Sequence, residues 1–242
     1  MNYYEGADFL GNWELRNRCQ TNPIYQVNLN IEKTGETYKC IWKINKANTQ
    51  HEYLGIGIVI DNQLFVSRFS NKVPGGGVGL YRPIGDLRSN SALWASTQNF
   101  NTLGSGIALR EDTSENFEDN YKVRYFIKGN ESPTFDLKIL KSQQNEIYLL
   151  NWSVDDEVKL HGVGMISKGQ MPLAYGGTNF DYEVVILNIE HENGRTTLKE
   201  KCGSLSNGLT VYHSCFFAVY FRYSLILIAN LFAKWPSIHW YD

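Results

Sequence analysis

The stretch that decides the fold is LGIGIVIDNQLFV, residues 54–66, because it returns in similar form as HGVGMISKGQMPL, residues 161–173. Each copy has a Gly-x-Gly segment, then a short polar turn, then a second segment rich in apolar residues. Two apolar strands joined by a short polar turn predict a tight β-hairpin. In the second copy Gly169 supplies the positive φ that such a turn needs. The sequence therefore predicts the same hairpin twice.

The similarity between the two halves of the chain extends to other segments, in the same order. NWELR at residues 12–16 returns as NYKVR at residues 120–124, and the Tyr-x-x-x-Trp pair of residues 38–42 returns at residues 148–152. The offset stays between about 104 and 110 residues. A half of that length is enough for one small domain. We expect two domains of the same fold, residues 1–110 and residues 120–213, with an acidic linker at residues 111–119.

The hydrophobic pattern within each half repeats every second residue. Val27, Leu29 and Ile31 alternate with polar residues, and residues 38–45 do the same. Such alternation is typical of antiparallel strands that cover a core with one face. Turn signals separate eight such segments in the first half, near residues 12–18, 24–33, 37–45, 52–60, 64–69, 78–84, 92–97 and 103–109. Eight matching segments follow, from about 120–127 to 208–213, and no helix of ten or more residues is expected before residue 213.

The number and spacing of these segments favour a barrel in each half. Eight short strands joined in sequence by short turns are what an up-and-down barrel needs, and closure removes the exposed sheet edges. An aromatic content of 14% with little proline also suits a β protein. We expect an all-β protein with two tandem antiparallel up-and-down eight-stranded barrels. A β-sandwich is the alternative for the same number of strands.

A short motif on the first expected strand carries a family resemblance. Gly11-Asn12-Trp13 resembles the Gly-x-Trp motif on the first strand of lipocalins and avidins, the calycin group of eight-stranded barrels. In that group the tryptophan closes one end of the barrel, which is what the resemblance implies for Trp13. The second half departs from the motif, since it has Asp119-Asn120-Tyr121 at the same place. The resemblance implies a calycin-like barrel and identifies no ligand.

The C-terminal tail, residues 214–242, is expected to have no counterpart in the first half. Residues 215–233 are mostly apolar, and their number just suits a membrane span. Arg222 counts against a span, because an arginine near the middle costs about 2.5–3.5 kcal/mol on insertion scales. Three interpretations stay open: a membrane anchor, a helix or strand packed on the second barrel, or a non-native extension beyond the true domain end.

Composition and motifs argue against several classes of function. A net charge of -2 without a Lys/Arg run gives no basic surface for nucleic acid. The four cysteines and five histidines show no metal-ligand spacing, so we expect neither a metal nor another cofactor. No nucleophile elbow or paired carboxylates can be placed, which disfavours an enzyme without excluding one. The N-terminus lacks a signal peptide, which predicts a cytoplasmic protein, membrane-associated if the tail is an anchor.

Tryptophan and arginine residues of the first half are the candidate ligand contacts. Trp13, Trp42 and Trp94 lie on the first, third and seventh expected strands, where they can line a cavity for an apolar ligand. Arg68 and Arg82 share alternation faces with apolar residues and are placed to clamp an acidic group if those faces point inward. The alternative is that the tryptophans are core residues and that the arginines reach solvent at strand ends. Of the three tryptophans, the second half keeps one, so the first barrel is favoured as the binding site.

Two hypotheses about function follow. The first is a non-catalytic binding protein that holds a small apolar or amphipathic molecule in the first barrel, acidic if the arginines point inward. The second is a structural or protein-interaction module with filled barrels, tethered to a membrane if residues 215–233 form an anchor.

Overall fold

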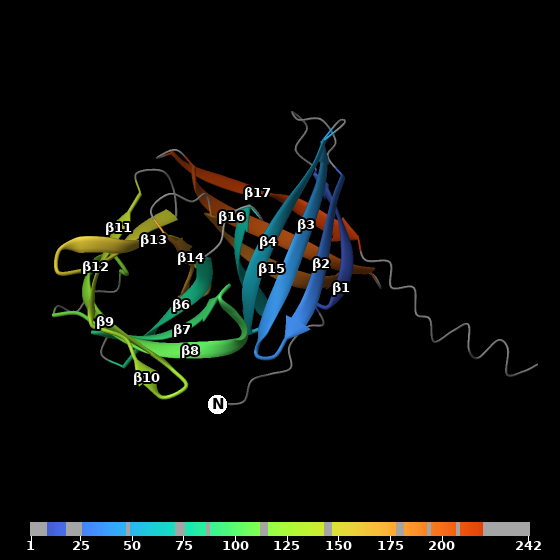
Figure 1. Ribbon diagram of the computed structural model, residues 1–242. Helices are drawn as coiled ribbons and strands as arrows, with labels where there is room; N and C mark the ends of the chain where they lie inside the picture. Colours follow the sequence, from blue (N-terminus) through green and yellow to red (C-terminus); the bar gives the residue numbers. More distant parts are fainter. Residues whose placement is uncertain are drawn as a thin grey trace, which may run out of the picture.

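The computed structural model describes residues 9–17, 26–46, 49–70, 76–85, 88–111, 116–142, 147–177, 182–192, 195–206 and 209–219 of the 242-residue chain. These residues form an all-β structure (Figure 1). Its strands are β1 (Gly11–Asn17), β2 (Gln26–Thr34), β3 (Thr37–Lys46), β4 (Thr49–Ile60), β5 (Gln63–Ser70), β6 (Gly76–Ile84), β7 (Ser89–Ser96), β8 (Asn99–Leu109), β9 (Asp119–Ile127), β10 (Asn130–Glu131), β11 (Phe135–Lys141), β12 (Ile147–Val154), β13 (Glu157–Met165), β14 (Met171–Gly176), β15 (Tyr182–Glu192), β16 (Arg195–Ser206) and β17 (Leu209–Val219).

The strands form two sheets with antiparallel pairing throughout. The first is a closed barrel in the order β1-β17-β16-β15-β5-β4-β3-β2, and β1 pairs with β2 to complete it. The second, which we call the curled sheet, has the order β10-β9-β11-β12-β13-β14-β6-β7-β8. It bends until β8 pairs with β9 as well (Figure 1). The expected β class and the expected eight-stranded closed barrel are therefore confirmed.

Each sheet takes strands from both halves of the sequence. The barrel combines β1–β5 from the first half with β15–β17 from the second, so blue and orange strands lie side by side in Figure 1. The curled sheet combines β9–β14 from the second half with β6–β8 from the first. The expected tandem arrangement, with one half in each barrel and a division at residues 111–119, is wrong. The up-and-down order holds from β1 to β5 and then passes to β15.

The exchange is symmetric, because equivalent strands meet in equivalent register. In each sheet, strands of the first half pair with strands of the second half at two junctions. At one junction Val66 pairs with Val185 in the barrel, and the equivalent residues Leu173 and Gly79 pair in the curled sheet. At the other junction Leu15 pairs with Ala218 in the barrel, and the equivalent residues Val123 and Ala108 pair in the curled sheet. The molecule thus consists of two related sheets, one closed and one curled, that exchange strands within one chain.

Three apolar cores hold this arrangement together. One fills the barrel, with Trp42 and Leu64 among its residues, and one lies inside the curled sheet, with Val123 and Leu137 among its residues. The third lies between the two sheets and includes Phe65 on β5. Leu64, Phe65 and Val66 are consecutive and all fully buried, because one face of β5 lies in the barrel and the other lies against the curled sheet. A strand buried on both faces shows a continuous apolar run in place of alternation.

The two predicted hairpins are confirmed. Asp61 and Asn62 connect β4 to β5 with φ values of 49° and 61°, which is the backbone of a two-residue turn with positive φ at both positions. Lys168 and Gly169 take φ values of 49° and 73° at the equivalent place. There the amide nitrogens and carbonyl oxygens of Ser167 and Gln170 bond reciprocally at 2.9 Å.

Two expected boundaries differ from the structure. β17 continues to Val219 and pairs with both β1 and β16, so residues 214–219 belong to the barrel and match β8 of the first half. Residues 220–242, with most of the expected membrane span, lie outside the described residues. Within the expected linker, the side chain of Phe117 is buried in the curled sheet, as that of Phe9 is in the barrel. In the described part of the chain, no helix is long and apolar enough to cross a membrane.

Candidate functional site

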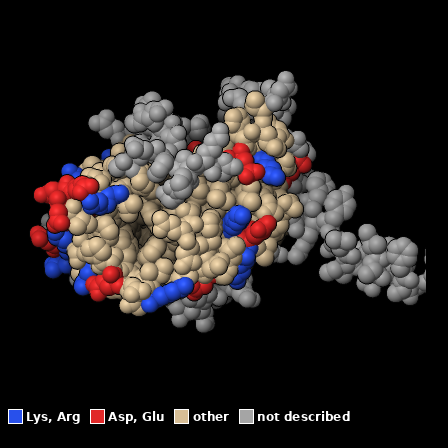
Figure 2. All heavy atoms as spheres, in the orientation of Figure 1, with Lys and Arg blue, Asp and Glu red and all other residues tan. Residues whose placement is uncertain are grey.

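A cavity of about 480 Å³ lies inside the curled sheet. Figure 2 shows a hollow in this part of the molecule, bordered mainly by uncharged residues. The volume falls within the range of about 300–1,000 Å³ that is usual for small-molecule sites. Its described lining comes from most strands of the sheet: Gly79, Leu80, Tyr81, Ala92, Leu93, Trp94, Ser96, Gln98, Asn99, Tyr125, Ile127, Asn130, Glu131, Ser132, Phe135, Trp152, Leu160, Leu173 and Tyr175.

Aromatic rings form much of the wall of the cavity. The rings of Trp94 and Tyr125 meet edge to face, with centroids 6.1 Å apart and an interplanar angle of 72°. Phe135 lies 6.0 Å from Tyr125, and Tyr175 lies 6.2 Å from Trp152, between ring centroids. Rings at these separations and angles attract one another beyond simple burial and hold fixed positions. The cavity therefore has a rigid aromatic wall.

Hydrogen bonds join three of these aromatic residues. The indole nitrogen of Trp152 donates to the hydroxyl oxygen of Tyr125 at 2.6 Å. The hydroxyl groups of Tyr125 and Tyr81 are 2.5 Å apart, and either can be the donor. We call Tyr81, Tyr125 and Trp152 the polar triad. It places polar atoms within a wall that is otherwise mainly apolar.

The phenols of the cavity stay neutral at ordinary pH. Burial raises the pKa of Tyr81 and of Tyr175, and it raises that of Tyr125 well above its ordinary value. Removal from water disfavours the phenolate because a charge is costly in an apolar site. These hydroxyl groups therefore act as neutral hydrogen-bond donors or acceptors.

Glycine residues on β8 make room for two of the rings. A side-chain Cβ at Gly104 would lie 2.2 Å from the Trp94 ring, and one at Gly106 would lie 2.7 Å from the Tyr125 ring. The Gly104-Ser105-Gly106 stretch thus holds aromatic rings close to the backbone of the strand. Two glycines at alternate positions of a predicted strand are a signal in the sequence that side chains from neighbouring strands pack there.

The cavity offers little net charge. Among its described lining residues only Glu131 is ionisable at neutral pH, and its carboxylate is 2.8 Å from the guanidinium of Arg124. Arg68 and Arg82 are not among those lining residues. The geometry of the cavity favours an uncharged ligand over an acidic one.

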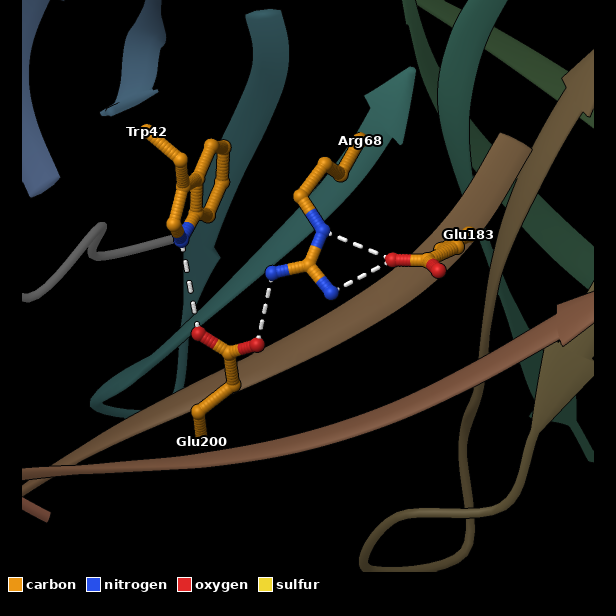
Figure 3. Close-up of polar contacts among 4 residues, drawn as sticks. All are labelled: Trp42, Arg68, Glu183 and Glu200. Atoms are coloured by element: carbon orange, nitrogen blue, oxygen red, sulfur yellow. Dashed lines mark hydrogen bonds and ion pairs between the residues drawn. The ribbon is translucent and has the colours of Figure 1, made fainter. Parts of the chain in front are cut away.

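Arg68 instead lies in the barrel within a network of charges (Figure 3). Its guanidinium is 2.7 Å from the carboxylate of Glu200 on β16 and 2.5 Å from that of Glu183 on β15. It also lies over the ring of Trp42, 5.2 Å from the centroid, while the indole nitrogen of Trp42 donates to Glu200 at 3.4 Å. Carboxylates of the protein therefore occupy the place that an acidic ligand was expected to take.

Equivalent positions of the barrel and the curled sheet carry different side chains. Arg68 pairs with Gly55 on β4 as Tyr175 pairs with Gly162 on β13, so Arg68 and Tyr175 are equivalent. Glu200 pairs with Leu187 as Ala92 pairs with Tyr81, which makes the small side chain of Ala92 the counterpart of Glu200. Glu200 thus takes up space in the barrel that the smaller Ala92 leaves in the curled sheet, whereas Arg68 and Tyr175 are both large.

The structure separates the three tryptophans that were expected to form one lining. Trp13 and Trp42 are buried in the barrel core, and the indole nitrogen of Trp13 donates to the carbonyl oxygen of Phe9 at 2.9 Å. Trp94 lines the cavity, because β7 belongs to the curled sheet. The expected joint lining is wrong for this reason.

Arg82 lies near the hairpin and away from the cavity. Its guanidinium is 2.7 Å from Asp61 and 2.9 Å from the side-chain oxygen of Gln170. This placement matches the alternative in which the arginine reaches toward solvent at the end of a strand. Arg82 therefore joins the two hairpin regions of the molecule.

Cys40 and Cys202 are buried thiols in the barrel core and form no disulfide. Burial raises the pKa of Cys40 and that of Cys202, the latter to about 12. A thiol with a raised pKa is a poor nucleophile because little thiolate forms. Among the described residues, no group of three or more His, Cys, Asp or Glu side chains is arranged to hold a metal ion.

Comparison with known proteins adds little to this geometry. No family model matches the chain, and no curated protein matches it. A porin-like protein from Bacteroides uniformis is similar in structure, with 10% sequence identity over 87% of this chain and 96% of that one. The TM-score is 0.21, which is too low for any inference about fold or function.

Proposed function

We propose that this protein is a non-catalytic binding protein that holds a small apolar or amphipathic molecule inside the curled sheet. The observation that carries the proposal is the cavity of about 480 Å³ with its wall of aromatic rings. Burial of an apolar ligand there removes apolar surface from water, which contributes a favourable free energy of about 25 cal/mol for each Å² buried. The rigid wall supports binding because little side-chain freedom is lost when the ligand enters.

The proposal places the ligand in the curled sheet and leaves the barrel without one. The large side chains of Trp13, Trp42 and Arg68 take up the barrel interior. The Gly11-Asn12-Trp13 motif lies on β1 of the barrel, and the curled sheet has Asp119-Asn120-Tyr121 at the equivalent place. The calycin-like role that we propose, an enclosure of strands around a small ligand, therefore belongs to the sheet without the motif.

Titration with N-phenyl-1-naphthylamine, a neutral apolar fluorophore, tests the proposal. We expect saturable binding with one site per chain and a rise in probe fluorescence. Trp94→Ala removes part of the cavity wall and is expected to weaken binding about tenfold, the effect of roughly 1.4 kcal/mol. Trp42→Phe, a change in the barrel core, is the matched control and is expected to leave the affinity within about twofold. Absence of saturable binding to the wild-type protein would remove the proposal.

A second candidate function is a structural or protein-interaction module. The filled barrel favours it, since Glu200 and Arg68 leave no acidic-ligand site there. For this function the aromatic cavity would have no role, and Trp94→Ala would alter stability without altering any binding. The titration above separates the two candidates.

A further inference from the structure

The hydrogen count of the polar triad points to a particular kind of ligand. Tyr81, Tyr125 and Trp152 together carry three donor hydrogens, one on each polar group. Two contacts connect the three groups, and both converge on the hydroxyl oxygen of Tyr125. Whichever hydroxyl donates between Tyr81 and Tyr125, two hydrogens are used and one remains.

The remaining hydrogen belongs to one of the two tyrosine hydroxyls, and both residues line the cavity. Tyr81 is 2% exposed and Tyr125 is partly buried. A buried donor without an acceptor costs about 1–3 kcal/mol relative to one that is satisfied. A ligand with an acceptor atom recovers this free energy, whereas a pure hydrocarbon that displaces water does not.

The charges around the cavity select among acceptors. An anion would find no cationic side chain among the described lining residues, and the one carboxylate there, that of Glu131, already has Arg124 as its partner. A cation would suit the aromatic rings, but it has no use for a hydrogen-bond donor. A neutral acceptor, such as a carbonyl or an ether oxygen or an aromatic ring nitrogen, fits both the rings and the triad.

We propose that the cavity is specific for an uncharged, flat cyclic molecule that carries one hydrogen-bond acceptor, which the polar triad meets with its remaining hydrogen. This inference rests on the proposed function and narrows its ligand class. Flat rings suit the cavity because aromatic walls pack on ring faces and edges.

Four probes with one carbon skeleton test the inference by calorimetric titration at pH 7. They are indane, 1-indanone, 1-aminoindane and indane-1-carboxylate, which differ in the acceptor and in charge. We expect 1-indanone to bind about tenfold more tightly than indane, the effect of one net hydrogen bond, and the two charged probes to bind more weakly than 1-indanone. Equal affinity for indane and 1-indanone would overturn the inference and leave the proposed function standing. Tightest binding of 1-aminoindane would also overturn it, and no binding of any probe would remove both proposals.

A variant and a spectroscopic measurement assign the effect to the triad. In the triple variant Tyr81→Phe, Tyr125→Phe, Trp152→Phe, the ratio of the two neutral affinities is expected to fall to within about twofold, because these three positions no longer offer a donor. The ratio cancels effects of cavity shape that act on both probes. Tyr53→Phe, in the barrel, is the control and should keep the wild-type ratio. Independently of the variant, the carbonyl stretch of 1-indanone bound to wild-type protein should lie below its frequency in hydrocarbon solvent, and an unshifted band would contradict the inference.

Discussion

At the scale of single residues, Arg68 and Glu200 show how a charged pair can replace a ligand. Glu200 has a side-chain exposure of 0% and Arg68 one of 11%, so both groups are removed from water and depend on each other. The pair adds little stability over apolar residues of the same size, but removal of one partner leaves a buried charge uncompensated. Glu183 compensates only in part, since it also reaches solvent.

The first prediction concerns this pair. Glu200→Gln keeps the shape of the side chain and removes its charge, so we expect the free energy of unfolding to fall by about 3–5 kcal/mol in urea denaturation. Asp136→Asn is the matched change in the exposed ion pair with Lys122, and it should cost less than about 1 kcal/mol. Similar losses for the two variants would show that the Arg68 network is not a buried unit.

The second prediction concerns pH. Burial raises the pKa of Tyr81, of Tyr175 and of Cys202 in the folded protein, so the unfolded chain loses these protons first as pH rises. Stability from these groups is therefore complete below about pH 8 and is lost as pH rises above their ordinary pKa values of about 8.5–10, by up to about 1.4 kcal/mol per pH unit for each group. Urea midpoints measured at pH 8, 10 and 11 should fall, and Tyr175→Phe should reduce the slope. A constant midpoint across this range would contradict the assignment.

At the scale of elements, β8 contributes to the cavity wall because two of its residues have no side chain. Gly104 and Gly106 place rings of β7 and β9 against the strand backbone. At the position of Gly106, β17 of the barrel has Phe216 in place of glycine. The two sheets therefore differ in sequence at this position of equivalent strands.

The third prediction follows from β8. In Gly104→Ala the added Cβ must displace the Trp94 ring, because it would otherwise lie 2.2 Å from it. Overpacking of this kind costs about 1–3 kcal/mol, and we expect a lower melting temperature together with a change in tryptophan emission. Ser105→Ala, on the exposed side of the same strand, should leave both measurements unchanged. Wild-type emission from Gly104→Ala would mean that Trp94 is held elsewhere.

The elements are also where prediction from the sequence worked best. Period-two alternation and turn residues gave the eight strand segments of the first half, and the turns at Asp61 and Lys168 followed from local chemistry. The pairing between β5 and β15 could not be predicted from the sequence. β6 and β15 are equivalent strands with similar hydrophobic patterns, so the local sequence does not determine which of them pairs with β5. The unbroken apolar runs at Leu64–Val66 and Val184–Leu187 did carry a signal that both faces are buried.

Because of this ambiguity, the candidate site was predicted less well from the sequence than the strands were. The sequence predicted Trp94 as a ligand contact in a site built by the first half of the chain. In the structure Trp94 lines a cavity together with Tyr125, Phe135 and Trp152, which come from the second half. A lining assembled from two halves cannot be found by examining one half. An inward-pointing Arg68 was one of two alternatives drawn from the sequence, and its carboxylate partners come from β15 and β16, more than a hundred residues away.

At the scale of the whole molecule, the strand exchange joins the two sheets into one unit. Three strands of each sheet belong to the half that builds the other, and an apolar core lies between them. Each half of the chain has strands in both sheets, so neither sheet can form from one half alone. The barrel and the curled sheet should therefore not behave as independent domains.

The fourth prediction is a single cooperative unfolding transition. Circular dichroism and tryptophan fluorescence should give coincident urea curves, because Trp42 reports the barrel and Trp94 the curled sheet. Glu200→Gln and Gly104→Ala act in different sheets, and each should move the whole transition. Two separate transitions, or a biphasic curve for either variant, would show that the sheets unfold independently.

The strand exchange between the two sheets also determines when the barrel can be completed during synthesis of the chain. β5 ends at Ser70 and its partner β15 begins at Tyr182, so the barrel has an open edge while roughly 110 further residues are made. At about 5–20 residues per second, that edge waits roughly 5–20 seconds outside the ribosome. An unpaired edge of apolar strands is a template for aggregation, so a nascent chain of this protein needs protection of that edge, as by a chaperone, until its last strands emerge.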